Sequence, residues 1–147
     1  MPGLLILAHA PLASSLKAVA AHVFPNETGI EAVDVAADDP LDRIEELART
    51  LLVRVRDPEA LILTDVFGAT PCNVAMRLAQ GPQVRVVTGV SVPMLWRAIG
   101  YRQEPLVQLV ERAVAGGVQG VMQLSPTRPH VQGARQIDDQ DRTHDQQ

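Results

Sequence analysis

Short apolar runs alternate with amphipathic stretches along most of this chain. Five apolar runs predict strands over residues 3–8, 30–35, 60–64, 83–88 and 118–124. Apolar residues that recur every three or four positions predict helices over 11–24, 40–55, 70–79, 92–99 and 105–115. The run at 60–64 is almost wholly apolar, which is typical of a strand covered by helices on both faces. The order βαβαβαβααβ therefore predicts an α/β fold of three α/β/α layers around a mainly parallel sheet.

Proline, glycine and polar residues predict where these elements and the folded domain end. Asp39-Pro40 predicts a helix N-cap followed by the first helical residue. Gly116-Gly117 predicts the end of the last helix, ahead of the run at 118–124. Residues 126–147 are rich in glutamine and aspartate and contain few aliphatic residues. We therefore expect one domain over residues 1–125 and a disordered polar tail over 126–147.

Composition narrows the class of protein. With 147 residues, 46% of them hydrophobic, the chain is long enough for one buried core. Its net charge of −4 is unlike that of the basic proteins that bind nucleic acid. No apolar run approaches the roughly 20 residues that span a bilayer, and no basic segment precedes the first run as in a signal peptide. A single cysteine excludes an intrachain disulfide and a thiolate-rich metal site. We expect a cytoplasmic protein without a metal or a cofactor.

Two side chains that can carry chemistry stand directly after predicted strands. His9 follows the first strand, and Asp65 follows the third. Taken singly, such a histidine is more often structural, and such an aspartate is as often a helix cap or loop residue. Right-handed crossovers place the first and third strands side by side, however, which brings the two within hydrogen-bond reach. A carboxylate on one ring nitrogen fixes the tautomer and leaves the other nitrogen as a nucleophile.

The residues after Asp65 predict an anion site. Gly68 permits a tight turn, Ala69 follows it, and Thr70 and Pro71 suit the cap and the first turn of the next helix. Free amides at a helix N-terminus bind anions such as phosphate. No Gly-Lys-Ser or Gly-Lys-Thr of a nucleotide-binding loop occurs in the chain. An imidazole, an orienting carboxylate and an amide cradle together favour phosphoryl transfer through a phosphohistidine.

A family resemblance rests on three features of the sequence. They are a strand ending in His9, the run Thr64-Asp65-Val66-Phe67-Gly68-Ala69-Thr70-Pro71-Cys72-Asn73, and the run Thr88-Gly89-Val90-Ser91-Val92-Pro93-Met94-Leu95. Over about residues 3–124 the chain resembles the mannose-family enzyme IIA component of the bacterial phosphoenolpyruvate:sugar phosphotransferase system. The resemblance implies that His9 accepts a phosphoryl group on Nε2 from the phosphocarrier HPr and passes it to a IIB component. It implies that Asp65 orients His9 and that Gly68, Ala69 and Thr70 face the phosphate. It also implies a homodimer that exchanges the last strand, 118–124, in an antiparallel arrangement.

Three positions depart from the common pattern of that family. Ala10 and Ala69 stand where many members have glycine, and Ser91 stands where many have asparagine.

Other functions also stay open. The alternatives are a phosphotransferase subunit of a dihydroxyacetone kinase, a regulatory phosphate acceptor without a transport role, and a binding module without catalysis. A two-component receiver domain fits less well, because the chain lacks the acidic pair and the lysine that such a domain needs.

Overall fold

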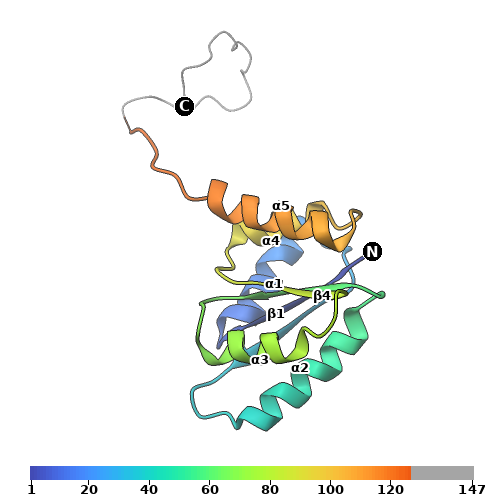
Figure 1. The fold of residues 1–147 in the computed structure, drawn as a ribbon. Helices are drawn as coiled ribbons and strands as arrows, with labels where there is room; N and C mark the ends of the chain where they lie inside the picture. Colours follow the sequence, from blue (N-terminus) through green and yellow to red (C-terminus); the bar gives the residue numbers. More distant parts are fainter. Residues whose placement is uncertain (127–147) are drawn as a thin grey trace.

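The computed structural model describes residues 1–126 and contains a parallel sheet between two layers of helices (Figure 1). The elements follow in the order β1 (Gly3–His9), α1 (Leu12–Val23), β2 (Ile30–Val35), α2 (Leu41–Val55), β3 (Ala60–Thr64), α3 (Thr70–Leu78), β4 (Val84–Val87), α4 (Val92–Gly100) and α5 (Leu106–Gln119). The α/β class, the three layers and the first nine predicted elements are thereby confirmed. Apart from Pro126, the predicted tail lies outside the described residues.

The sheet has the strand order β2-β1-β3-β4, and all its pairings are parallel. β1 therefore lies between β2 and β3, which confirms the predicted adjacency of the first and third strands. In the register of these pairs, His9 is opposite Val35 of β2, and Leu7 is opposite Thr64 of β3. Because the strands are parallel, their carboxyl ends and the loops that lead to α1–α4 meet at one edge of the sheet.

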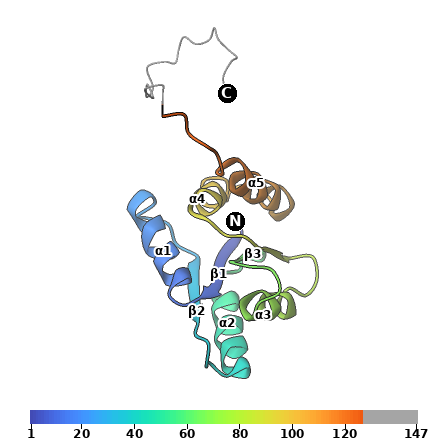
Figure 2. The same ribbon diagram turned by 90° about the vertical axis from the view of Figure 1, so that its left-hand side faces the viewer.

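Alternate residues of β1 face two separate hydrophobic clusters. Its even-numbered residues, from Leu4 to Ala8, pack with α1, α4 and α5. Leu5 and Leu7 pack with α2 and α3 on the other face. Figures 1 and 2 show these two helical layers on opposite sides of the strands. The alternation places His9, which follows Leu5 and Leu7 at a spacing of two residues, on the α2 and α3 face.

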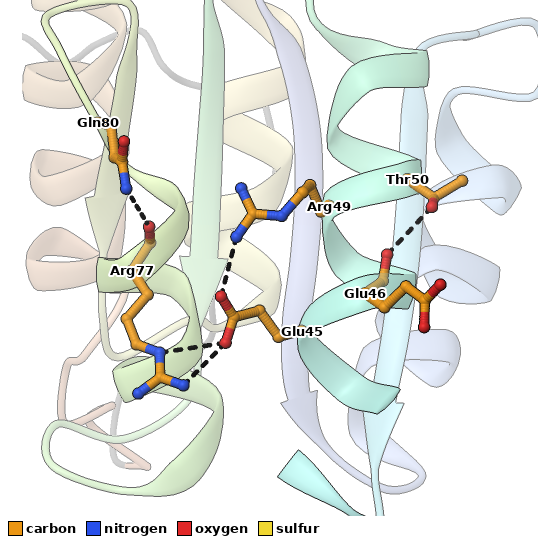
Figure 3. A network of polar contacts seen from close by, with 6 residues as sticks. All are labelled: Glu45, Glu46, Arg49, Thr50, Arg77 and Gln80. Atoms are coloured by element: carbon orange, nitrogen blue, oxygen red, sulfur yellow. Dashed lines mark hydrogen bonds and ion pairs between the residues drawn. The ribbon is translucent and has the colours of Figure 1, made fainter. Parts of the chain in front are cut away.

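Ion pairs join the two helices of one layer. Glu45 of α2 accepts hydrogen bonds at Oε1 from Arg77 of α3, at 2.8 Å from Nη2 and 3.1 Å from Nε, and at Oε2 from Arg49, at 2.8 Å (Figure 3). The hydrogen bond from Arg77, with that from Arg49, lowers the pKa of Glu45 although partial desolvation opposes the shift. This network orients α3 against α2.

A buried arginine joins the opposite edge of the sheet. Arg102 is 4% exposed and donates from Nε to the Pro2 carbonyl at 2.9 Å and from Nη1 to the Thr28 carbonyl at 2.6 Å. Its Nη1 also pairs with Glu27 at 3.0 Å. These contacts connect the segment after α4 to the chain just before β1 and β2, far from the carboxyl edge.

The predicted end of the last helix and the strand after it are wrong. α5 continues through Gly116 and Gly117 to Gln119, and residues 120–124 form no strand in the described part of the chain. A Cβ at Gly116 would lie 2.7 Å from Cβ of Arg97, and one at Gly120 would lie 2.6 Å from Cβ of Pro93. Gly116 and Gly120 therefore let α5 pack closely against α4, and the helix ends at its C-cap Gly120, not at Gly116 and Gly117. The predicted exchange of this segment between protomers stays a prediction.

The start of α2 also differs by one residue from the prediction. Pro40 is the N-cap and Leu41 the first helical residue. The Asp39 carboxylate instead accepts a hydrogen bond from the Ala36 amide at 2.8 Å. The aspartate thus stabilises the loop between β2 and α2 and does not cap the helix.

Candidate functional site

The structure brings His9 and Asp65 together at the carboxyl edge of the sheet, as predicted. His9 is the last residue of β1, and Asp65 directly follows β3. Nδ1 of His9 lies 2.8 Å from Oδ2 of Asp65, and the same oxygen accepts the His9 backbone N–H at 3.0 Å. The imidazole is 49% exposed, whereas the carboxylate is only 14% exposed. The ring is thus held by a mostly buried partner while it faces solvent.

The backbone around Asp65 fixes its carboxylate. Oδ1 accepts the Val66 N–H at 3.0 Å. The loop after β4 also binds the main chain of Thr64 and Asp65. The Gly89 amide donates to the Asp65 carbonyl at 3.1 Å, and the Val90 amide donates to the Thr64 carbonyl at 2.9 Å. Gly89 has φ +85°, a left-handed conformation that favours glycine. Asp65 therefore needs no side-chain motion to hold His9.

The charge on Asp65 decides which ring nitrogen of His9 is free. Burial raises the pKa of Asp65, but the hydrogen bonds from the His9 backbone and ring outweigh burial and hold that pKa below its ordinary value. An ionised carboxylate can only accept hydrogen bonds, so Nδ1 of His9 must carry the proton that joins the two groups. The lone pair of the neutral ring is then on Nε2, the nitrogen not engaged by Asp65.

The loop after Asp65 leads to the open start of α3. Gly68 has φ +88°, which any other residue would adopt only with strain. Ala69, not Thr70, is the N-cap, and Thr70 is the first helical residue, which corrects the predicted boundary by one position. Alanine has no side-chain acceptor, and no side chain caps α3. The amides of the first turn are thus left to bind an anion.

The helix that follows His9 begins differently. Asp34 of β2 accepts the Ser14 amide of α1 at Oδ1, at 3.0 Å, and the Ser14 hydroxyl at Oδ2, at 2.5 Å. A carboxylate therefore already occupies the start of α1. Of the two helices that follow β1 and β3, only α3 has a start without a capping side chain in the described structure. We did not predict the role of Asp34, although its place near the end of a strand was a signal.

The three departures from the family pattern fit the local structure. Ala69 has φ −89°, so no glycine is needed there. Ser91 caps α4 by accepting the Met94 amide at 3.3 Å, as an asparagine side chain also could. Ala10 donates its amide to the Val35 carbonyl at 2.9 Å and has no positive φ.

Within residues 1–126, no group of three or more histidine, cysteine, aspartate or glutamate side chains is arranged to hold a metal ion. None of the helices in that range is long and apolar enough to cross a membrane.

The chain is similar to known proteins of one family. Residues 3–114 match the model of the EIIA-man family, described as PTS system fructose IIA component. The fructose-specific EIIA component of the phosphotransferase system of Bacillus subtilis (strain 168) is 26% identical over 105 residues, which cover 70% of this chain and 72% of that protein.

Solved structures extend the similarity to the fold. The mannose/sorbose-specific IIA subunit from Enterococcus faecalis superposes with a TM-score of 0.77 at 26% identity, covering 88% of this chain and 98% of that one. An EIIA component from Streptococcus agalactiae, 20% identical, shares the fold with a TM-score of 0.76 over 84% of this chain and 97% of that one. This chain belongs to the EIIA-man family of phosphotransferase-system IIA components, which act as phosphotransferases.

Proposed function

We propose that this protein accepts a phosphoryl group from phospho-HPr on Nε2 of His9 and passes it to a IIB component. The observation that carries the proposal is the hydrogen bond of 2.8 Å between Nδ1 of His9 and Asp65, on a ring that is 49% exposed. This contact leaves Nε2 as the nucleophilic atom of an exposed imidazole. Family membership favours this relay over a dihydroxyacetone kinase subunit, a receiver domain or a binding module without catalysis.

The transfer needs one bond to form and one to break. The Nε2 lone pair of His9 attacks phosphorus, while the bond from phosphorus to the HPr donor atom breaks and its electron pair leaves with HPr. The ring gains positive charge as the phosphoryl group arrives, and the ionised Asp65 stabilises that charge through Nδ1–H. Transfer to the IIB component follows the same path, with Nε2 now the leaving atom.

The start of α3 is the proposed binding site for the phosphoryl oxygens. Gly68 turns the chain there, and the amides of the N-cap Ala69 and of the first helical residue Thr70 lie at a helix start that no side chain caps. Helix amides and the helix dipole favour negative charge at that end. Alternation from Leu5 and Leu7 places His9 on the same face of the sheet as α3, which supports this site over the start of α1, where Asp34 already binds.

We place the proposed relay in the cytoplasm, where it would serve sugar uptake or the regulation of sugar uptake. The relatives named above are specific for fructose and for mannose or sorbose, so the proposal concerns the phosphoryl relay and names no single sugar. The relay as proposed requires no metal and no cofactor.

A direct labelling experiment tests the proposal. The protein is incubated with labelled phosphoenolpyruvate, enzyme I and HPr, and the label on the chain is counted. Wild type and His22→Gln, a change at an exposed histidine of α1, should take up equal label, whereas His9→Gln should take up none and remain folded. The label should be acid-labile and alkali-stable. Full labelling of His9→Gln would refute the assignment.

We also propose a homodimer. Val121, Met122 and Leu124 are 84%, 67% and 76% exposed, an apolar segment that a second copy would cover. A variant ending at Ser125 should sediment as a dimer and accept label normally, whereas a variant ending at Gly120 should sediment as a monomer. A Ser125 variant that is monomeric, or a Gly120 variant that stays dimeric, would contradict this arrangement.

A further inference from the structure

The short segment that joins β1 to α1 is held from both neighbouring strands. On the β3 side, Asp65 accepts the His9 amide at 3.0 Å. On the β2 side, the Val35 carbonyl accepts the Ala10 amide at 2.9 Å, and Asp34 binds the Ser14 amide and hydroxyl. Contacts at residues 9, 10 and 14 therefore fix both ends of this segment.

Asp34 supplies a contact that α1 cannot make for itself. The N-cap of α1 is Pro11, which has no side-chain acceptor, and the first turn contains no acidic residue. Asp34 is opposite Ala8 in the register of β1 and β2, and Ala8 packs on the face where α1 lies. The carboxylate thus reaches the third amide of α1 from the neighbouring strand and replaces the missing cap.

We propose that Asp34 is a positioning residue for phosphoryl transfer: it anchors the first turn of α1 and thereby fixes the main chain that carries His9. The proposal rests on the proposed function of His9. Asp34 acts through Ser14 and the backbone, and we assign it no contact with the phosphoryl group.

The expected effect follows from the precision that transfer requires. Nucleophile and phosphorus must meet at near-attack distance and in line, and a displacement of about 1 Å can slow a reaction about 100-fold. Without Asp34, the Ala10 amide contact and the Asp65 contacts still hold His9. We therefore expect a smaller loss, about tenfold in the maximal rate of transfer. HPr docking should change little, because Asp34 is only partly exposed.

Three variants separate the contributions. Asp34→Ala removes both contacts. Asp34→Asn can rebuild both, since its carbonyl oxygen accepts the Ser14 amide and its amide donates to the Ser14 hydroxyl. Arg102→Lys is the matched control, because it disturbs a buried hydrogen-bond network at the opposite edge of the sheet. Each variant is compared with wild type for thermal stability, and rapid-quench transfer from phospho-HPr is measured over a range of HPr concentrations.

The proposal expects a specific pattern. Asp34→Ala should lose about tenfold in maximal rate with half-saturation by HPr within about twofold of wild type, and Asp34→Asn should return to within about threefold. Arg102→Lys should lose stability but transfer at the wild-type rate when folded. A wild-type rate in folded Asp34→Ala would overturn the proposal, as would an equal slowing of Arg102→Lys at equal loss of stability.

A measurement without phosphate distinguishes failure of this proposal from failure of the proposed function. In NMR spectra of the unphosphorylated protein, Asp34→Ala should shift or broaden the backbone amides of His9 and Ala10, whereas Asp34→Asn should leave them near their wild-type positions. Unchanged amides in Asp34→Ala would overturn the role of Asp34 even if transfer occurs. If wild type accepts no phosphoryl group, the proposed function fails, and the amide shifts still decide whether Asp34 fixes His9.

Discussion

Replacing Asp65 by asparagine should slow phosphoryl transfer without preventing HPr from binding. The carboxylate accepts two hydrogen bonds from His9 at one oxygen, at 2.8 Å and 3.0 Å, and is only 14% exposed, so water cannot readily replace it. Asparagine has nearly the same shape, but its amide can donate to Nδ1 of His9. The ring proton then moves to Nε2, and the nucleophilic lone pair is lost.

The size of the effect follows from one charge-assisted hydrogen bond. Such a bond is worth about 1.5–3 kcal/mol, and each ~1.4 kcal/mol of transition-state stabilisation is a factor of ten in rate. If the contact strengthens as the ring gains charge, Asp65→Asn should slow transfer by roughly 10- to 150-fold. The negative charge of Asp65 also repels the incoming phosphate, which opposes this stabilisation. We therefore expect a slowing of at least about tenfold, the lower end of this range, if Asp65 has the proposed role.

Rapid-quench transfer from phospho-HPr measures the rate, and titration with unphosphorylated HPr measures binding. Asp57→Asn is the matched control, because it makes the same chemical change at a carboxylate that is 85% exposed and precedes β3 at the opposite edge of the sheet. The control should transfer like wild type. An unchanged rate in Asp65→Asn would remove Asp65 from the mechanism, and a loss confined to HPr affinity would make it a docking residue.

Three further predictions concern stability. The buried hydroxyl of Thr64 has no hydrogen-bond partner in the described structure, so Thr64→Val should raise the free energy of unfolding by about 1 kcal/mol in urea titrations; a decrease would mean that the hydroxyl has a partner. Arg102→Met should lower that free energy by about 3 kcal/mol, because it leaves buried carbonyl groups unpaired; a loss below about 0.5 kcal/mol would refute this. The pKa of Asp65 is lower in the folded protein than its ordinary value of 3.8, so its contribution is full above that pH and is lost as pH falls through the folded value. The stability difference between wild type and Asp65→Asn should therefore shrink in acid, and a difference that grows there would contradict the direction of the shift.

The sequence predicted those parts of the fold and the site that depend on local pattern. The apolar run that ends at His9 and the run before Asp65 each have the length and composition of a buried parallel strand. Adjacency of these two strands then follows from the handedness of the crossovers, so the pairing of His9 with Asp65 could be expected from the sequence alone.

The errors arose where contacts between distant segments decide the outcome. Gly116 and Gly117 suggest the end of a helix when read alone, but close packing of α5 on α4 leaves no room for a side chain at Gly116. The contact of Asp34 with Ser14 depends on the register of β1 and β2, which the pattern of apolar residues does not specify. The one-residue difference at Asp39 reflects competition between a cap and another local hydrogen bond, and the one at Thr70 is the usual uncertainty of a helix boundary read from a pattern.

The central claim is that the phosphoryl group is carried on Nε2 of His9 while Asp65 holds Nδ1. Long-range proton–nitrogen NMR correlation of the ¹⁵N-labelled, phosphorylated protein assigns the substituted ring nitrogen directly. We expect one phosphorylated histidine, His9, with phosphorus bonded to Nε2 and a proton retained on Nδ1. Phosphorus bonded to Nδ1, or carried by any residue other than His9, would contradict the account.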